Sequence, residues 1–393
     1  MSPLHNPFSP GAGTQPPELA GRDELRDSLR VSMERTRRGL SAKCAVMTGL
    51  RGVGKTVLLD RVRLDAEDSG IQTLRIEAPE DRSLPAILLP ELRQALLRMS
   101  RIQQARAFAE RALRALAGFA KGMKLKYDDI EVGLDLESEA GLADNGDLEQ
   151  DLQMLMEAVG EAAAKAETAA VLFIDEAQYI KQKELAALIT TLHRMAQRRL
   201  PVLMIGAGLP QIPGQMGKAK SYAERLFDFP VIGPLSKEAA YQAIFRPVQS
   251  QKMAIDEAAL ELIYQQTHGY AYFLQEWGKH SWDAAPQSPI GAQDVVTASI
   301  TARAALDDSF FRVRFDRLTP LEKRYLRAMA ELGPGPHRSG EVAEVMRRDV
   351  TSLGPVRNKL VAKGMIWSPS HGDTGFTVPF FDEFMKRVMP RDD

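Results

Sequence analysis

One short stretch restricts the fold of this chain more than any other: residues 49–56 read Gly-Leu-Arg-Gly-Val-Gly-Lys-Thr. The spacing G-x-x-x-x-G-K-[ST] is that of a phosphate-binding loop, the Walker A motif. An apolar run at residues 44–47 precedes the loop, and an apolar helical pattern begins after it at Val57. Because a chance glycine-rich turn does not account for these flanks, the pattern predicts strand, loop and helix in that order.

Each position of the motif has a chemical task. Gly49, Gly52 and Gly54 let the backbone curl so that its N–H groups point inward, and such a nest at a helix N-terminus attracts phosphate. Lys55 can reach the β- and γ-phosphates of ATP, and the Thr56 hydroxyl can hold Mg²⁺. The residues predicted to bind the nucleotide in this loop are Gly49, Gly52, Val53, Gly54, Lys55, Thr56 and Val57.

A second motif strengthens the first. Residues 169–174 form a continuous apolar run, as expected for a buried parallel strand, and Asp175 and Glu176 follow it at once. Open α/β sheets bind ligands at the carboxyl ends of their strands. We therefore predict a Walker B motif, in which Asp175 binds Mg²⁺ through water and Glu176 orients and deprotonates the attacking water. The alternative is that the two carboxylates only cap the helix expected near residues 181–197.

The composition is that of an ordinary globular protein of two or three domains, with 393 residues and a net charge of −1. No global field attracts nucleic acid, so nucleic-acid binding requires a local patch. The single cysteine, Cys44, excludes internal disulfides and suits the cytosol. Residues 1–17 lack the apolar core of a signal peptide, and no apolar stretch approaches the ~20 residues that span a bilayer. We expect a cytoplasmic protein without a membrane segment.

Periodicity and turn signals divide the chain into four parts. The predicted fold class is α/β, with a doubly wound parallel sheet followed by a helical lid and a C-terminal winged helix. The predicted parts are a flexible segment at 1–18, a nucleotide-binding base at 19–234, a lid of about four helices at 235–312 and a winged helix at 313–393. The last sheet strand is expected at 227–232.

The base domain carries an insertion at about residues 84–147. Its first part, 85–120, is mostly helical, with Pro90 as a kink or early break. Residues 123–127 and 130–136 alternate apolar and polar positions, which predicts an exposed hairpin. Such an insertion suits an interaction surface for a protein partner, and the more conservative interpretation is a lid or a packing elaboration.

The last 80 or so residues show three helices and a hairpin, at 318–332, 339–347, 353–363 and 365–378, which is the winged-helix order. Between residues 338 and 363, six Lys and Arg stand against three Asp and Glu, a local charge of +3. Arg357, Asn358 and Lys359 lie on the third helix, and these residue types suit base edges and phosphates of double-stranded DNA. The wing at 368–373 lacks a basic tip, and protein binding by this part stays open.

The set of Walker A, Walker B, four-helix lid and winged helix resembles the AAA+ ATPases, over about residues 18–390. Within them it is similar to the origin-recognition and archaeal-ATPase branch. Leu19-Ala20-Gly21-Arg22 resembles a motif whose backbone packs near adenine in that branch, so Gly21 and Arg22 are added to the nucleotide-binding residues. Thr267-His268-Gly269-Tyr270 resembles the start of the seventh helix of the branch.

The chain departs from the family pattern at two positions. The strand that usually ends in a polar sensor, often Asn, here ends in Gly-Ala-Gly-Leu-Pro-Gln at 206–211, where Gln211 is a possible substitute. This run also resembles the Gly-x-Pro-x-Leu signature of transposition target-selection and secretion ATPases. The lid has Ala271-Tyr272-Phe273 where the family often has a sensor Arg. A slow ATPase that acts as a switch fits these departures better than a fast motor.

Arg225 stands just before the last predicted strand, where AAA+ proteins place an arginine finger. A guanidinium there stabilises charge on the γ-phosphate held by a neighbouring subunit, which implies a homo-oligomer in ATP. The alternative is a solvated arginine paired with Glu or Asp.

These features together predict an ATP-binding and hydrolysing AAA+ switch that binds DNA through its winged helix. Replication initiation, transposition or another mobile-element or defence role would suit such a switch. The rival interpretation is a signalling or scaffold ATPase whose winged helix is a packing or protein-interaction module. A non-hydrolysing nucleotide-binding module is a third possibility, against which Glu176 argues.

Overall fold

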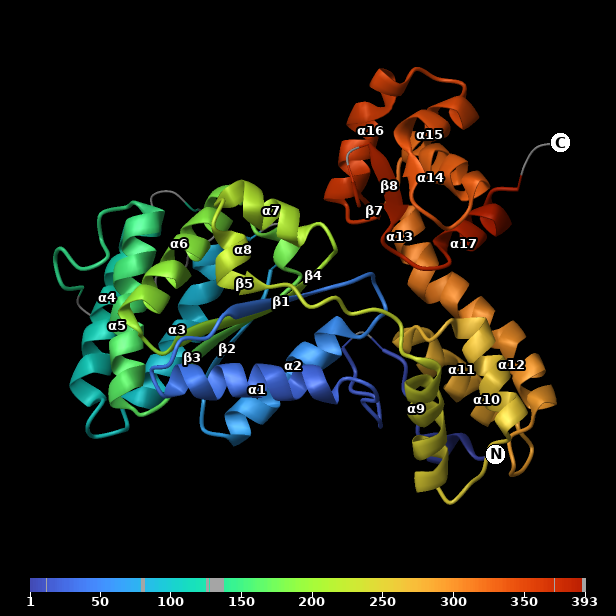
Figure 1. Ribbon diagram of the computed structural model, residues 1–393, viewed down its shortest axis with the longest axis horizontal. Coiled ribbons are helices and arrows are strands. Elements are labelled where there is room, and N and C mark those ends of the chain that lie inside the picture. Colours follow the sequence, from blue (N-terminus) through green and yellow to red (C-terminus); the bar gives the residue numbers. More distant parts are fainter. Residues whose placement is uncertain (12, 79–81, 125–126, 128–137, 371, 391–393) are drawn as a thin grey trace. The chain divides into compact units, whose positions relative to one another are not determined.

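The computed structural model describes residues 1–393 except 12, 79–81, 125–126, 128–137, 371 and 391–393 (Figure 1). The chain forms two compact units. The first comprises residues 1–22, 49–57 and 232–393, and the second comprises residues 23–48 and 58–231. The phosphate loop therefore belongs to the same unit as the C-terminal helices, whereas residues 44–48 before it and 58–68 after it belong to the other.

The second unit contains a five-stranded parallel sheet of order β2-β3-β4-β1-β5. Its strands are β1 (Cys44–Thr48), β2 (Gln72–Glu77), β3 (Ala170–Asp175), β4 (Val202–Gly208) and β5 (Phe227–Asp228). The strands β1 and β4 are buried along their whole length, and β3 is buried up to its last residue. Continuous apolar runs of this kind are stable only with both sheet faces covered. The predicted doubly wound α/β fold is confirmed.

Helices precede and connect these strands (Figure 1). The main ones are α1 (Asp23–Arg37), α2 (Lys55–Asp68), α3 (Leu84–Met99), α4 (Arg106–Lys124), α5 (Leu148–Lys165) and α6 (Gln182–Arg198). Shorter ones follow β3 and β4, namely η2 (Ala177–Tyr179), α7 (Ile212–Ala219) and α8 (Ala223–Leu226).

The insertion differs from the sequence expectation in two details. Pro90 neither ends nor interrupts α3, which begins with an N-cap at Ser83 and continues to Met99. Met123, expected to start a hairpin, belongs to the last turn of α4. The remainder of the predicted hairpin falls mostly outside the described residues.

The last sheet strand is also shorter than predicted. The strand β5 covers only Phe227 and Asp228, although the Thr48 N–H still donates to the Pro230 carbonyl at 2.9 Å and Thr48 pairs with Val231. Proline has no N–H to contribute to a ladder, so Pro230 interrupts regular pairing at this edge of the sheet.

The first unit holds four helices within the range expected for the lid: α9 (Lys237–Ser250), α10 (Glu257–Thr267), α11 (Ala271–Ala284) and α12 (Ala292–Ala305). The N-terminal segment, expected to be flexible, packs on α11 instead. It contains the short helix η1 (Pro3–His5), and the ring of Phe8 is 3% exposed beside Gly278, where an added Cβ would lie 2.7 Å from it. The Trp282 Nε1–H donates to the Ser2 carbonyl at 3.0 Å.

A π-helical turn, η3 (Leu306–Phe311), and α13 (Arg312–Asp316) lead from the lid to the C-terminal elements. These are α14 (Pro320–Leu332), β6 (His337–Arg338), α15 (Ser339–Met346), α16 (Val350–Ala362), β7 (Ile366–Trp367), β8 (Asp373–Phe376) and α17 (Phe381–Val388). The strands pair antiparallel in the order β6-β8-β7. The three helices and the hairpin follow the order predicted for a winged helix, and β6 and α17 were not predicted.

Aromatic rings join the C-terminal elements to the end of the lid. Phe311 of η3 stacks on Phe384 of α17 with ring centroids 5.2 Å apart, and Phe315 meets the same ring edge-on.

Among the described residues, no helix has the length and apolar character to cross a membrane.

Candidate nucleotide site

The phosphate loop begins directly after β1 and ends in the first turn of α2. Gly52 and Gly54 have φ of +79° and +90°, a region that side chains other than glycine rarely adopt. The helix α2 starts directly after these glycines, at Lys55. A nest of N–H groups joined to a helix N-terminus is the arrangement that binds phosphate.

The Lys55 ammonium is held by the loop itself. Its Nζ donates to the Gly49 carbonyl at 3.0 Å and to the Leu50 carbonyl at 2.8 Å. Thr56 is half-buried beside it, whereas the Val53 side chain is 2% exposed and packs inward. The predicted roles of Lys55 and Thr56 therefore rest on side chains, and that of Val53 on its backbone N–H.

The tip of the loop is hydrogen-bonded to two distant segments of the first unit. The Tyr272 N–H at the start of α11 donates to the Gly52 carbonyl at 3.0 Å, and the Arg51 N–H donates to the Thr377 carbonyl at 2.9 Å. Phe310 of η3 stacks on the Tyr272 ring, with centroids 4.9 Å apart. Burial, with a further contribution from Glu276, raises the pKa of Tyr272 to about 12, so the phenol stays protonated.

Gly21 and Arg22, predicted to lie near adenine, belong to the same unit as the loop. Gly21 has φ of +68° and is so close to α9 that an added Cβ would lie 2.7 Å from Ala239. The Arg22 guanidinium donates to the Gly233 carbonyl at 2.5 Å, and burial lowers the pKa of this side chain. Their contact with a nucleotide stays a prediction.

The acidic pair lies in the second unit. Asp175 is the last residue of β3, and Glu176 follows it in the left-handed region with φ of +50°. The Glu176 N–H donates to Asp175 Oδ1 at 2.8 Å, and both side chains are half-buried. Because β1, β3 and β4 pair in parallel, their carboxyl ends lie at the same end of the sheet.

Sequence reasoning missed Gln178. Its Nε2 donates to Glu176 Oε2, and its Oε1 accepts the Leu209 N–H at 2.9 Å, just after the end of β4. Gln178 is 8% exposed. The sequence shows a polar residue two positions after Glu176, the predicted base. Nothing in the sequence, however, places that residue beside β4.

Gln211, the possible substitute for the polar sensor, is at the start of α7. Its side-chain oxygen is buried and has no hydrogen-bond partner within the described part of the chain. A buried amide oxygen without a partner is costly, so this group is poised to accept a hydrogen bond. The sensor role of Gln211 stays a prediction.

The predicted Mg²⁺ ligands, Thr56 and Asp175, offer a hydroxyl and a carboxylate, both hard oxygen donors. The described residues contain no cluster of three or more His, Cys, Asp or Glu that could hold a metal without other ligands. Mg²⁺ usually binds one or two protein oxygens together with waters and substrate phosphates. The binding of Mg²⁺ by Thr56 and Asp175 stays a prediction.

Arg225, the predicted arginine finger, lies on the four-residue helix α8. Its side chain is exposed. An exposed guanidinium can reach another molecule, and it can equally be a solvated surface charge.

The three predicted DNA contacts of α16 fall into two groups. Asn358 and Lys359 are exposed. Arg357 instead turns back to the hairpin: its guanidinium donates to Thr374 Oγ1 at 2.9 Å, to Ser368 Oγ at 2.8 Å and to the Asp373 carbonyl at 2.9 Å. Three hydrogen bonds within the chain make Arg357 a brace between α16 and the wing.

Comparisons with known proteins agree with these motifs. Residues 18–205 match a family described as AAA ATPase domain, and residues 308–385 match a domain of unknown function, DUF8462. No curated protein matches the chain. A Walker-type ATPase of Pyrococcus abyssi is similar in fold, with a TM-score of 0.59 and 16% identity over 96% of this chain and 99% of that one.

Two further solved structures match less closely. Cdc6p of Pyrobaculum aerophilum has a TM-score of 0.47 and 16% identity, over 97% of this chain and 98% of that one. The RuvB Holliday junction branch migration motor of Thermotoga maritima has a TM-score of 0.45 and 14% identity, over 93% of this chain and 96% of that one. The motifs, the sheet order and the family match together show an AAA ATPase domain at residues 18–205.

Proposed function

We propose that this protein is a slow ATP-dependent switch whose nucleotide state controls the binding of double-stranded DNA by its C-terminal winged helix. The observation that carries the proposal is the pair of hydrogen bonds from the tip of the phosphate loop, one to the lid at Tyr272 and one to the C-terminal part at Thr377. Because the phosphate loop contacts both parts directly, nucleotide binding in the loop can change the conformation of both. We expect the protein to be cytoplasmic.

The hydrolytic step assigns a role to each residue. The loop N–H groups and Lys55 would bind the β- and γ-phosphates, and Thr56 and Asp175 would hold Mg²⁺, which would neutralise phosphate charge. Glu176 accepts a proton from water as the water oxygen bonds to the γ-phosphorus. The bond from that phosphorus to the bridging oxygen breaks, and ADP leaves with the electron pair.

The nucleotide signal would pass through backbone contacts. Phosphate bound to the N–H groups of residues 52–56 fixes the loop, and the Gly52 carbonyl and Arg51 N–H are parts of the same backbone segment. A change of backbone conformation at residues 51–52 would alter the bonds to Tyr272 and Thr377. This route does not need the sensor arginine that the lid lacks.

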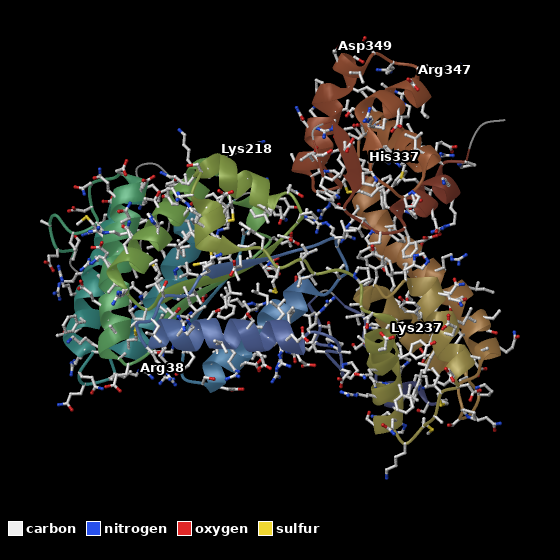
Figure 2. All side chains as sticks on the ribbon, in the orientation of Figure 1. Arg38, Lys218, Lys237, His337, Arg347 and Asp349 are labelled. Carbon is white, nitrogen blue, oxygen red and sulfur yellow. The ribbon has the colours of Figure 1, made fainter. Side chains whose placement is uncertain are left out.

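DNA binding rests on the exposed polar face of α16 and its neighbours. Asn358 and Lys359 are exposed on the third helix, where winged-helix and related domains meet the major groove. Arg347, labelled with Asp349 in Figure 2, is exposed at the turn between α15 and α16. The local charge of +3 over 338–363 suits phosphate contacts.

One observation favours the rival function, a scaffold that binds protein. Val345 and Val350 on α15 and α16 are 40% and 43% exposed, and exposed apolar side chains near a basic helix also suit a protein partner. Measured DNA binding decides between the two functions.

We expect Lys359→Ala to weaken duplex DNA binding and to lower the slope of log K against log salt by about 0.9, because one phosphate contact is lost. A salt series of fluorescence anisotropy on duplex DNA measures both effects. Lys386→Ala is the matched control, since Lys386 is exposed on α17 and carries the same charge. ATP hydrolysis without DNA should be unchanged in both variants.

The variant Arg357→Ala separates bracing from contact. Loss of the three hydrogen bonds to the wing should lower the melting temperature, which Lys359→Ala should leave unchanged. If the wild-type protein binds no duplex DNA at low salt in ATP or in ADP, the DNA-binding proposal fails and the scaffold takes its place.

Arg225→Ala should lower ATP turnover without lowering nucleotide affinity, because a finger acts on a site of the neighbouring subunit. Mixing this variant with Lys55→Ala protein should restore some turnover, since one intact loop and one intact finger then meet across a subunit boundary. Lys218→Ala, which removes an exposed charge from the neighbouring α7, should keep full turnover (Figure 2). No restored activity, together with a monomer in ATP by light scattering, would refute action in trans.

A further inference from the structure

We propose that Gln178 is the positioning residue that holds the catalytic carboxylate of Glu176, and that it ties this carboxylate to the end of β4. The inference rests on the proposed role of Glu176 as general base. The strand β4 itself does not end in the polar sensor residue that the family pattern has there. Its evidence is a chain of two hydrogen bonds, from Glu176 through the Gln178 amide to the Leu209 N–H.

The orientation of the Gln178 amide follows from its partners. A backbone N–H can only donate, so the group facing Leu209 at 2.9 Å must be the amide oxygen. The amide nitrogen is then directed at Glu176 Oε2, where a carboxylate can only accept. A flipped amide would lose both bonds, which fixes the side chain as a donor to the proposed base.

The surroundings leave the amide little freedom. Gln178 is 8% exposed, Leu209 is 1% exposed, and Gln178 lies in η2, which begins immediately after Glu176. An added Cβ at Gly208 would lie 3.0 Å from Gln178 Oε1, so a larger residue at this position would push against the Gln178 amide. The two hydrogen bonds of Gln178 thus connect the short helix η2 to the end of the central strand β4.

This arrangement gives Gln178 a function in the reaction. A general base must stand within hydrogen-bond reach of the water that it deprotonates, and a misplacement of about 1 Å can cost about 100-fold in rate. Glu176 follows β3 directly, and β4 is the next strand of the sheet. Gln178 therefore sets the carboxylate relative to two strands rather than one, and movement at the end of β4 would move the base.

Two substitutions test the proposal. Gln178→Met keeps the length of the side chain but removes both hydrogen bonds. Gln178→Glu keeps an oxygen for the Leu209 N–H and replaces the donor to Glu176 by a second carboxylate oxygen. We expect both to lower kcat by about 10- to 100-fold with nucleotide affinity unchanged. The readouts are steady-state turnover and titration with a fluorescent ATP analogue.

A pH series distinguishes positioning from a structural role. The carboxyl group introduced by Gln178→Glu can donate to Glu176 only when protonated, so its activity relative to wild type should rise as pH falls. In the Glu176→Gln background, Gln178→Met should add no further loss, because the group through which it acts is absent. A merely structural residue would give the same loss in both backgrounds and no relative recovery at low pH.

The outcomes separate this inference from the proposed function. If Glu176→Gln keeps wild-type turnover, the assignment of the base fails and the inference fails with it. If Glu176→Gln loses turnover but both Gln178 variants keep it, or if they raise it, the inference alone is overturned. Loss of turnover that tracks loss of nucleotide binding or of the folded state would also overturn it.

Discussion

Replacing Lys55 by Ala is expected to abolish ATP binding. The ammonium lies against the loop carbonyls of Gly49 and Leu50, where it can turn to a bound polyphosphate, and hydrogen bonds between charged partners are the strong ones. Equilibrium titration with a labelled nucleotide measures the effect directly.

A control and a second readout keep this result interpretable. Lys218→Ala removes a positive charge from the exposed face of α7 and should leave nucleotide affinity unchanged. The melting temperature of Lys55→Ala without nucleotide should stay near that of wild type, whereas ATP should raise the melting temperature of wild type only. Unchanged ATP affinity in Lys55→Ala protein would refute the phosphate-loop assignment.

Glu176→Gln should keep ATP binding but lose turnover by about 10²–10⁴-fold, the usual contribution of a general base. Gln fills the space of Glu, but its amide cannot take a proton from water. Single-turnover hydrolysis of labelled ATP, with nucleotide affinity measured on the same protein, separates the two effects.

A matched substitution tests whether any loss is specific. Glu110→Gln removes an exposed carboxylate from α4 and should have wild-type turnover. If Glu176→Gln also turns over ATP at the wild-type rate, the catalytic base lies elsewhere in the chain.

The sequence predicted the sheet and the loop because their signals are local. Apolar runs such as 169–174 are continuous, and the residues that follow them are polar and chemically distinctive. The motif at 49–56 specifies its own conformation, since its glycines and its helix start act within a few residues. Capping residues such as Ser236 mark the starts of helices in the expected lid, and the Ser236 side chain accepts the Ala239 N–H.

Other features depend on contacts between residues far apart in sequence. Gln178 meets Leu209 only because β3 and β4 are neighbours, and Arg51 meets Thr377 across more than 300 residues. No local pattern reports either pair. The packing of Phe8 on Gly278 was missed for the same reason, because a polar, glycine-rich segment reads as flexible until its partner surface is known.

Arg357 illustrates a different limit. A positive residue on the third helix of a winged helix is a reasonable DNA contact by residue type. Three acceptors within the hairpin, Thr374, Ser368 and the Asp373 carbonyl, take up its guanidinium instead. The residue type alone did not predict that the Arg357 side chain turns toward the hairpin. Asn358 and Lys359 remain the proposed DNA contacts.

The central claim is that the nucleotide controls DNA binding, and one measurement tests it most directly. Duplex DNA affinity of Glu176→Gln protein, which should hold ATP without consuming it, can be compared in ATP and in ADP at one salt concentration. We predict that the two affinities differ by roughly 5- to 150-fold, the usual range of coupling between two sites. Measurable DNA binding with equal affinity in ATP and ADP would contradict the switch.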